Sequence, residues 1–286
     1  DKKFQQLRSR IASADHQAEL PEPPGFTGTL RPYQRRGLGW LHFLRDTGLG
    51  GCLADDMGLG KTIQVLALLL TVHRERPGRP SLLVLPLSLL ANWRREAERF
   101  TPELRVFDFH GGDRWSRLED SGGFDAHDLI LTTYGTLRLD IARFDQQQTH
   151  FAYAVLDEAH AIENAQSQTS KAVRLLRADH RLAMTGTPVQ NHLGELWALF
   201  EFLNPGLLGR SSAWKRLIST ADNRGKGLDL QLLHRALAPV MLRRTKEQVL
   251  PDLPEKQEQD LLCELEGTQK QSYDALRRTF HEQFVE

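Results

Sequence analysis

Short apolar runs alternate with helical segments along most of this chain. The runs fall at residues 82–85, 106–109, 129–132, 153–156 and 182–184, and a further short strand is predicted just before a glycine-rich turn. Short runs that are apolar throughout and alternate with helices are typical of a mostly parallel sheet covered by helices on both faces. The sequence therefore predicts an α/β fold, in which ligands bind at the carboxyl ends of the strands.

The pattern changes at residue 194. Helical segments follow one another at 195–202, 214–218 and 228–237, and no further apolar strand is predicted before Leu261. The chain begins with an amphipathic segment around Leu7 that leads into a proline-rich linker. We therefore predict four parts: an N-terminal arm and linker at 1–26, the sheet lobe at 27–194, a helical protrusion at 195–242 and a connector at 243–286.

The glycine-rich turn carries the strongest chemical signal. A turn of this kind, between a strand and a helix, presents backbone N–H groups and the positive end of a helix dipole to a polyanion. Lys61 can place its charge beside the outer phosphates of a nucleotide, and the Thr62 hydroxyl can bind Mg²⁺. Asp55 stands where the strict G-x-x-x-x-G-K-[ST] pattern has its first glycine, so the turn alone leaves a fortuitous strand–turn–helix open. The predicted phosphate site comprises Asp56, Met57, Gly58, Leu59, Gly60, Lys61 and Thr62.

A second strand tip carries two acids. The run at 153–156 ends in Asp157 and Glu158. An aspartate at a strand tip beside a phosphate turn suits a Mg²⁺ contact, and the adjacent glutamate can orient and polarise an attacking water. The alternative is an ordinary capping aspartate with an exposed glutamate at the start of a helix. We assign His160 only a bridging role.

Two weaker signals complete the candidate site. The strand tip at 185–191 places hydroxyls and a side-chain amide around a Gly-Thr-Pro turn and could sense a third phosphate, although alone it would be only a turn. Gln34 lies one turn into a helix that begins near Pro32. Its amide can read an adenine edge, although an exposed glutamine usually has no such role.

Composition limits the partners and the compartment. The 286 residues include 37 basic and 37 acidic residues, so any nucleic-acid contact must come from local patches. Cys52 and Cys263 lack metal-ligand or redox spacing, and no apolar run approaches the roughly 18 residues of a membrane span. We predict an intracellular protein, cytoplasmic or nucleoid-associated in a bacterium and nuclear in a eukaryote.

Basic and aromatic residues elsewhere have ordinary interpretations. The basic clusters at 31–36 and 94–99 are interpreted as solvated faces, and the cluster at 243–246 as a brace between the connector and a lobe. The tryptophans are interpreted as packing residues rather than base-stacking platforms: Trp93, Trp115, Trp197 and Trp214.

Seven motifs occur in a fixed order along the chain. They lie at 30–34, 55–62, 83–93, 132–134, 157–160 (Asp-Glu-Ala-His), 185–191 and 242–246. In this order they resemble the motifs of Swi/Snf-type ATPases, the chromatin-remodeller-like translocases of helicase superfamily two. In that family an aspartate at the position of Asp55 is normal.

The resemblance implies a fold, cofactors and roles. It implies a RecA-like P-loop NTPase lobe with an appended helical protrusion, binding ATP and Mg²⁺. Lys61 and Thr62 would hold phosphates and metal, Asp157 would hold Mg²⁺, Glu158 would activate water and Gln34 would recognise adenine. Sequence-independent contact with, or coupling to, the backbone of double-stranded DNA is implied for Pro86, Ser88, Thr132, Thr133, Tyr134, Thr185, Thr187, Asn191, Arg244 and Lys246.

Two departures from the family pattern bear on activity. Glu163 precedes Asn164 where many relatives have a lysine, which argues against a phosphate contact there. The family also needs arginines from a second RecA-like lobe, toward which 243–286 would lead. Residues 1–286 alone are therefore expected to bind ATP weakly and hydrolyse it slowly. The amino-acid sequence at 50–57 resembles that of bacterial members of the family.

Two other functional classes stay open at this point. One is a strand-separating helicase or restriction-type motor on the same fold. The residues of the motifs match this class less well. The other is a nucleotide-gated interaction module without hydrolysis. Glu158 argues against such a module, because binding alone needs no water-activating carboxylate.

Overall fold

The computed structural model describes residues 18–186, 193–209, 237–249 and 265–284, together with five single positions at 211, 212, 214, 233 and 235. The chain divides into two compact units, Asp1–Pro251 and Asp252–Glu286. The predicted arm helix, most of the predicted helices at 214–218 and 228–237, and Cys263 lie outside the described residues.

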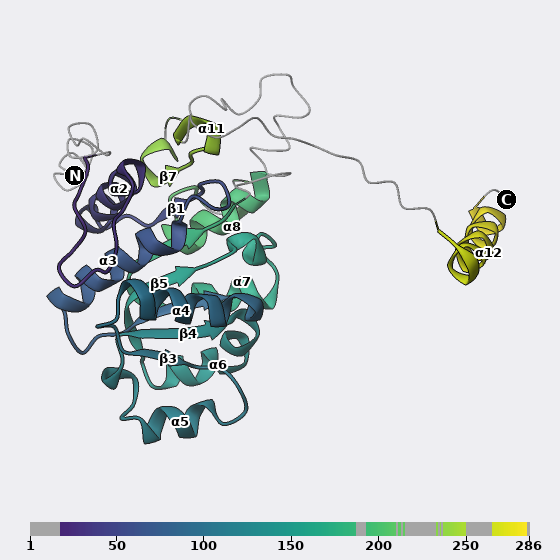
Figure 1. Ribbon diagram of the computed structural model, residues 1–286. Helices are drawn as coiled ribbons and strands as arrows, with labels where there is room; N and C mark the ends of the chain where they lie inside the picture. Colours follow the sequence, from purple (N-terminus) through teal and green to yellow (C-terminus); the bar gives the residue numbers. More distant parts are fainter. Residues whose placement is uncertain are drawn as a thin grey trace. The chain divides into compact units, whose positions relative to one another are not determined.

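A seven-stranded sheet forms the centre of the first unit (Figure 1). Its spatial order is β3-β4-β2-β5-β6-β1-β7, and every neighbouring pair is parallel. The sheet confirms the predicted α/β class, because all five apolar runs and the strand before the glycine turn are present in it. The strands are β1 Gly51–Leu53, β2 Ser81–Leu85, β3 Val106–Asp108, β4 Leu129–Thr133, β5 His150–Leu156, β6 Arg177–Met184 and β7 Met241–Leu242.

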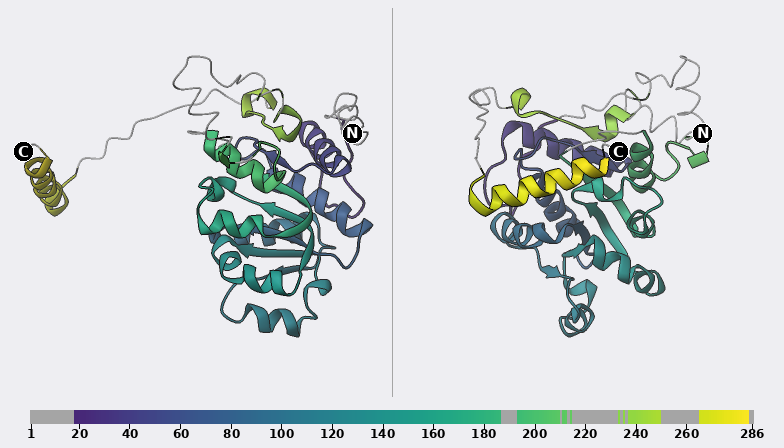
Figure 2. Two further views of the ribbon diagram at one scale, coloured as in Figure 1. Left: turned by 180° about the vertical axis from the view of Figure 1, so that it is seen from behind. Right: turned by 90° about the vertical axis from the view of Figure 1, so that its right-hand side faces the viewer.

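Helices cover the sheet on both faces, as the side view in Figure 2 shows. One layer consists of α2 Pro32–Thr47, α3 Lys61–Glu75 and α4 Leu90–Phe100, in which α3 packs between the other two. The other layer consists of α6 Tyr134–Gln146, α7 Gln168–Arg174 and α8 Leu193–Leu203. Shorter described elements are α5 Arg114–Asp120 and α11 Lys246–Val249, and the 3₁₀ turns Leu87–Leu89, Phe124–Ala126, Ala159–Ile162 and Ala238–Val240.

The core explains why the central strands β2 and β4 are mostly apolar. All residues of β2 and β4 are buried, because helices cover both of their faces. Helix α3 is likewise apolar around most of its circumference, and Val65 to Leu70 are buried between the sheet, α2 and α4. Burial raises the pKa of the Cys52 thiol in β1 to about 12, so this cysteine is an inert packing residue.

Strand β7 differs from the sequence prediction, which has no strand between residues 195 and 261. Met241 and Leu242 pair in parallel with Cys52 and Leu53 at the edge of the sheet. A two-residue strand is too short to show a period of its own, and its pairing with β1 defines it. The expectation of an uninterrupted helical pattern there was therefore wrong, while the predicted boundaries of the four parts stay predictions.

The second unit contains helix α12, Gly267–Phe284. Tyr273, Leu276 and Phe280 are exposed on it. None of the helices in the described part of the chain is long and apolar enough to cross a membrane.

A buried carboxylate near the start of β4 ties two loops together. Asp128 accepts hydrogen bonds from the Arg105 backbone N–H (2.9 Å), Nε (2.9 Å) and Nη2 (2.7 Å), and lies 2.9 Å from His73 Nδ1. Burial raises the pKa of Asp128, but these hydrogen bonds and the neighbouring positive charges outweigh it and hold the pKa below its ordinary value.

We expect Asp128→Asn to lower the free energy of unfolding by about 2 kcal/mol at pH 7, because it weakens charge-assisted hydrogen bonds in a buried position. A depressed carboxyl pKa stabilises the fold above the unfolded pKa and loses this effect as pH falls through the folded pKa. The difference from wild type should therefore shrink in acid, as measured by urea unfolding at pH 7 and pH 3. Asp120→Asn, at an exposed position on α5, is the control, and equal losses in both variants would contradict this account.

Candidate nucleotide-binding site

The glycine-rich turn joins the end of β1 to the start of α3, as the pattern predicts. Gly58 and Gly60 have φ angles of 86° and 74°, a region that L side chains rarely adopt. A Cβ on Gly60 would lie 2.5 Å from Gln34 Nε2, so this position also has no room for a side chain. The turn thus keeps its backbone accessible, which a phosphate cradle requires.

Lys61 and Thr62 are the first two residues of α3. The Lys61 Nζ donates to the carbonyl oxygen of Asp55 (2.7 Å) and lies 3.4 Å from that of Asp56. These carbonyls belong to the turn itself, so the ammonium is held over the turn and can exchange them for phosphate oxygens. Met57 is exposed at the tip, while Leu59 is buried and anchors the turn in the core.

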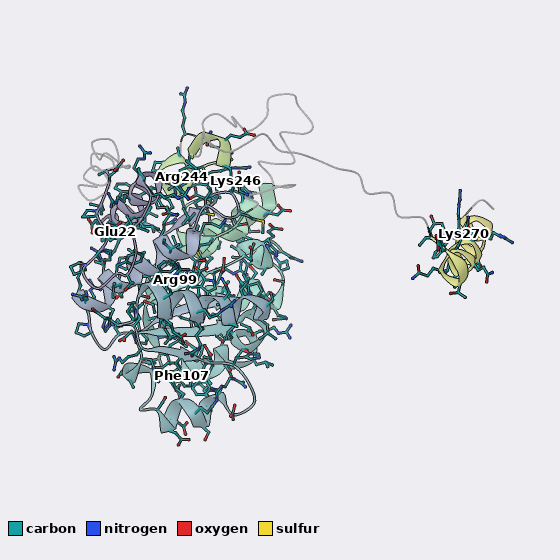
Figure 3. All side chains as sticks on the ribbon, in the orientation of Figure 1. Glu22, Arg99, Phe107, Arg244, Lys246 and Lys270 are labelled. Atoms are coloured by element: carbon teal, nitrogen blue, oxygen red, sulfur yellow. The ribbon has the colours of Figure 1, made fainter. Side chains whose placement is uncertain are left out.

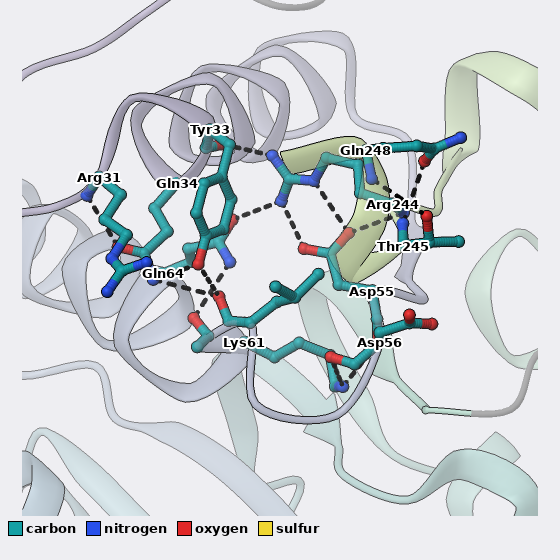
Figure 4. Close-up of polar contacts among 12 residues, drawn as sticks. Arg31, Tyr33, Gln34, Asp55, Asp56, Lys61, Gln64, Arg244, Thr245 and Gln248 are labelled. Carbon is teal, nitrogen blue, oxygen red and sulfur yellow. Dashed lines mark hydrogen bonds and ion pairs between the residues drawn. The ribbon is translucent and has the colours of Figure 1, made fainter. Parts of the chain in front are cut away.

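Gln34 and Tyr33 of α2 pack directly against the turn (Figure 4). Both donate to the Leu59 carbonyl, from Gln34 Nε2 at 3.1 Å and from the Tyr33 hydroxyl at 3.1 Å. Gln34 Oε1 also accepts from the Arg31 backbone N–H at 2.8 Å, which closes the start of α2. The structure places Gln34 at the nucleotide turn, and its reading of adenine stays a prediction. Sequence reasoning missed Tyr33, whose aromatic ring looked like an ordinary core residue.

Asp55 forms a buried ion pair with Arg244. The carboxylate is fully buried, and it accepts from Arg244 Nε (2.9 Å), from Nη2, and from the Arg244 backbone N–H (3.1 Å). The guanidinium also donates to Gln64 Oε1 (2.9 Å) and to the Tyr33 carbonyl. Arg244 therefore brings the glycine-rich turn, α2, α3 and the segment after β7 together. Its predicted bracing of the connector is consistent with these contacts, and its coupling to DNA stays a prediction.

The contact between the glycine-rich turn and the segment after β7 continues at the neighbouring residues. Asp56 N–H donates to the Arg244 carbonyl (3.0 Å), and the Lys246 N–H donates to Asp56 Oδ2 (3.0 Å). The Lys246 side chain is exposed and passes over Gly58, where a Cβ would lie 3.7 Å from Lys246 Cε. In Figure 3, Arg244 and Lys246 lie at one end of the first unit, away from Phe107 of edge strand β3.

Asp157 follows β5 and is held from three directions. The Trp93 indole N–H donates to Oδ2 (2.7 Å), the Glu158 backbone N–H donates to Oδ1 (2.9 Å), and the Tyr134 hydroxyl donates to the main-chain oxygen (2.7 Å). Burial raises the pKa of Asp157, while the two N–H groups and the charge of Lys61 act in the opposite direction. Strands β5 and β1 both pair in parallel with β6, so Asp157 and the glycine-rich turn lie at the same edge of the sheet.

Glu158 has an unusual backbone conformation for a residue with a side chain. Its φ is 48°, in the left-handed region, and the 3₁₀ turn Ala159–Ile162 begins directly after it. Such geometry is uncommon outside glycine and clusters at functional sites. Its Oε2 lies 3.3 Å from His160 Nδ1, so His160 contacts Glu158, and its bridging role stays a prediction.

The third strand tip also meets the glycine-rich turn. The Thr185 N–H donates to the Leu53 carbonyl (3.2 Å), and a Cβ on Gly186 would lie 3.0 Å from Met57 Cγ. Thr187 and Asn191 lie outside the described residues, so their roles stay predictions.

The predicted DNA-facing residues occupy different surroundings. Pro86 and Ser88 lie in the turn between β2 and α4, in which Ser88 and Leu87 are exposed and Pro86 is half-buried. Thr132 is buried and donates to the Phe109 carbonyl (2.9 Å), and Thr133 caps α6 by accepting from the Thr136 N–H (3.1 Å). Their hydroxyls therefore position the strand tip, and contact or coupling to DNA stays a prediction for these residues.

The residues present fit a nucleotide with Mg²⁺. No group of three His, Cys, Asp or Glu side chains that could hold a metal by itself is found among the described residues. Mg²⁺ bound with a nucleotide needs only one or two carboxylates beside the phosphates, because it retains waters and takes phosphate oxygens as ligands. Asp157, with Thr62 at the start of α3, meets that requirement, and the open backbone of the glycine turn provides the cradle.

Comparison with known proteins identifies the family. Residues 33–285 match the SNF2-related domain. The chain belongs to the SNF2-related family. Its sheet accordingly has the RecA-like fold of the ATPase cores in this family of helicase superfamily two, as the motif order indicates.

Two relatives illustrate the range of the family. A putative ATP-dependent helicase/translocase of Bacillus subtilis, YwqA, is 40% identical over 279 residues, covering 95% of this chain and 30% of that protein. The TATA-binding protein-associated factor MOT1 of Saccharomyces cerevisiae is 40% identical over 275 residues, covering 88% of this chain and 15% of that protein. The matched relatives include bacterial and eukaryotic proteins, so the bacterial resemblance stays a prediction.

Solved structures of the family share the fold. The Sulfolobus solfataricus SWI2/SNF2 ATPase core in complex with double-stranded DNA is 39% identical, with a TM-score of 0.73. The match covers 92% of this chain and 55% of that one. The core domain of the same archaeal ATPase is 40% identical, with a TM-score of 0.70. The SNF2-related chain thus spans about half of the solved ATPase cores that it matches.

Proposed function

We propose that this SNF2-related chain is the ATP-binding lobe of a DNA-stimulated ATPase that translocates on double-stranded DNA and remodels or displaces protein–DNA complexes. The observation that carries the proposal is that β1, which leads into the glycine-rich turn and Lys61, and β5, which ends at Asp157, both pair in parallel with β6, so that both tips lie at the same edge of the sheet. This arrangement supports a site in which Lys61 binds phosphate and Asp157 binds the metal at one edge of the sheet.

The side chains then have distinct roles in hydrolysis. Lys61 and the N–H groups of the turn bind the phosphates and stabilise the charge that develops on them. Asp157 and Thr62 hold Mg²⁺, which when bound neutralises phosphate charge. Glu158 orients the attacking water and accepts its proton. Gln34 lies at the turn, where an adenine would be read.

Contact with DNA is proposed at the same edge of the sheet. Ser88 is exposed and Pro86 is half-buried there, and the solved SWI2/SNF2 core that shares this fold is in complex with double-stranded DNA. Contacts to phosphates carry no base code, so translocation would be independent of sequence and binding would weaken as salt rises.

The arginines that complete the site in this family are proposed to come from a second RecA-like lobe. The segment after β7 is proposed to lead toward that lobe, and Arg244 and Lys246 connect this segment to the glycine-rich turn.

A steady-state ATPase assay tests this proposal. We expect hydrolysis by the full-length protein to rise at least tenfold with duplex DNA, and Glu158→Gln to remove about a hundredfold or more of the stimulated rate while nucleotide binding is retained. We expect residues 1–286 alone to hydrolyse ATP slowly with or without DNA. Strong DNA-stimulated turnover by residues 1–286 would contradict the need for a second lobe.

The other functional classes are distinguished by two further results. Displacement of a triplex-forming strand without separation of a duplex supports translocation, whereas ATP-driven duplex separation indicates a helicase. Nucleotide binding by the full-length protein without ATP hydrolysis would instead support a nucleotide-gated interaction module. Full ATPase activity in Glu158→Gln would show that Glu158 does not activate the water.

A further inference from the structure

The Trp93 side chain connects helix α4 to the acidic tip of β5. The indole is almost completely buried, at 1% exposure, and its N–H donates to Asp157 Oδ2 at 2.7 Å. The two residues are 64 positions apart in the sequence. Sequence reasoning assigned Trp93 only to packing, because an aromatic residue on an amphipathic helix usually serves the core.

The carboxylate of Asp157 is oriented by donors on both of its oxygens. Oδ2 accepts from Trp93 and Oδ1 accepts from the Glu158 backbone N–H at 2.9 Å. A carboxylate oxygen can accept two hydrogen bonds or ligands, so each oxygen keeps capacity for a further partner. The Tyr134 hydroxyl, at 2.7 Å from the main-chain oxygen, fixes the backbone behind it. The side chain is therefore restricted to one orientation.

The buried Trp93 indole can hold the Asp157 carboxylate in a defined orientation. A buried indole has a single N–H donor and is stiff, so it holds its acceptor at a defined point. Side chains behind a metal ligand set the orientation of that ligand, and their loss typically costs tenfold to a hundredfold in metal affinity. The Glu158 N–H is fixed by the chain itself, which leaves the indole as the side chain that determines the direction of Oδ2.

We propose that Trp93 is a positioning residue of the metal site, which holds the Asp157 carboxylate in the orientation that Mg²⁺ requires beside the nucleotide. This inference rests on the proposed function. It adds a specific role for a residue outside the acidic motif.

Trp40 provides a matched control. It is also buried, at 2% exposure, and its indole N–H donates to the Pro239 carbonyl at 2.9 Å. Trp93→Phe and Trp40→Phe therefore remove the same donor from similarly buried rings, but only the first removes a bond to Asp157. Binding of a fluorescent, non-hydrolysable ATP analogue to the full-length protein is measured in excess Mg²⁺ and in EDTA. The ratio of the two affinities reports the contribution of the metal.

We expect Trp93→Phe to reduce this ratio by about tenfold while the affinity in EDTA stays within about twofold of wild type. Trp40→Phe should leave the ratio unchanged. An unchanged ratio in Trp93→Phe, or equal reductions in both variants, would overturn the positioning role. If Trp93→Phe does not fold, replacement of Trp93 by 3-benzothienylalanine, which keeps the ring shape and lacks the N–H, gives the same readout.

The control measurement on wild type separates this inference from the function on which it rests. If wild type binds the analogue equally well with Mg²⁺ and with EDTA, the proposed Mg²⁺–ATP site is itself wrong. If wild type depends on Mg²⁺ and Trp93→Phe depends on it equally, only the role of Trp93 is wrong.

Discussion

Lys61→Ala in the full-length protein is expected to reduce DNA-stimulated ATP hydrolysis by at least about a hundredfold. Lys61 begins α3 and holds its ammonium over the backbone of the glycine-rich turn, where its Nζ donates to the Asp55 carbonyl. Removing a preorganised charge from the place where phosphate charge develops costs about 10² to 10³ in rate in comparable sites. The measurement is the steady-state rate at saturating duplex DNA.

Binding to DNA should be largely retained in the same variant. The proposed DNA contacts come from other strand tips, and their salt sensitivity depends on the phosphates that they neutralise. Fluorescence anisotropy at two salt concentrations checks this. Lys171→Ala, at an exposed position on α7, serves as the control for loss of a lysine. A Lys61→Ala protein with normal stimulated hydrolysis would show that the phosphates bind elsewhere.

Asp55→Gly completes the strict glycine-rich pattern, yet we expect it to destabilise the protein by roughly 3–5 kcal/mol. Asp55 is fully buried and neutralises Arg244, whose side chain is only 13% exposed. Without the carboxylate, the guanidinium is buried among Gln64 and the Tyr33 carbonyl with no counter-charge. The connection between the turn and the segment after β7 is lost at the same time.

Urea unfolding of residues 1–286 measures this effect directly. Asp56→Gly is the matched control, because it makes the same change at the next position, where the carboxylate accepts the Lys246 N–H and is less buried. It should cost clearly less stability. If Asp55→Gly were as stable as wild type, the ion pair would contribute nothing to the fold, and Asp55 would have to be explained by the nucleotide site alone.

Much of the fold follows from local pattern. The apolar runs that form β2, β4 and β5 are evident in the sequence, because strands covered on both faces need apolar residues at every position. One short strand was not predicted from the sequence: β7 has two residues and is defined by its pairing with β1. Pairing between distant segments has no local signature at this length.

The candidate site also contains residues that the local sequence predicts and residues that it does not. Gly58, Gly60, Lys61 and Thr62 could be predicted from sequence alone, because their backbone freedom, their charge and their place at a helix start are properties of a few adjacent residues. The acids that end β5 could be predicted for the same reason, since a strand tip in a parallel sheet faces the ligand edge.

The long-range contacts belong to tertiary structure. Asp55 meets Arg244 across 189 positions, and Trp93 meets Asp157 across 64. In the sequence, Asp55 looked like a departure from the glycine-rich pattern and Trp93 like an ordinary packing residue. The sequence by itself determined which residues are proposed to bind phosphate and metal, because backbone freedom, charge and position at a strand or helix end are local properties. Only the packing of distant segments decided which side chains hold them in place, because hydrogen bonds and buried ion pairs depend on where the folded chain brings their two partners together.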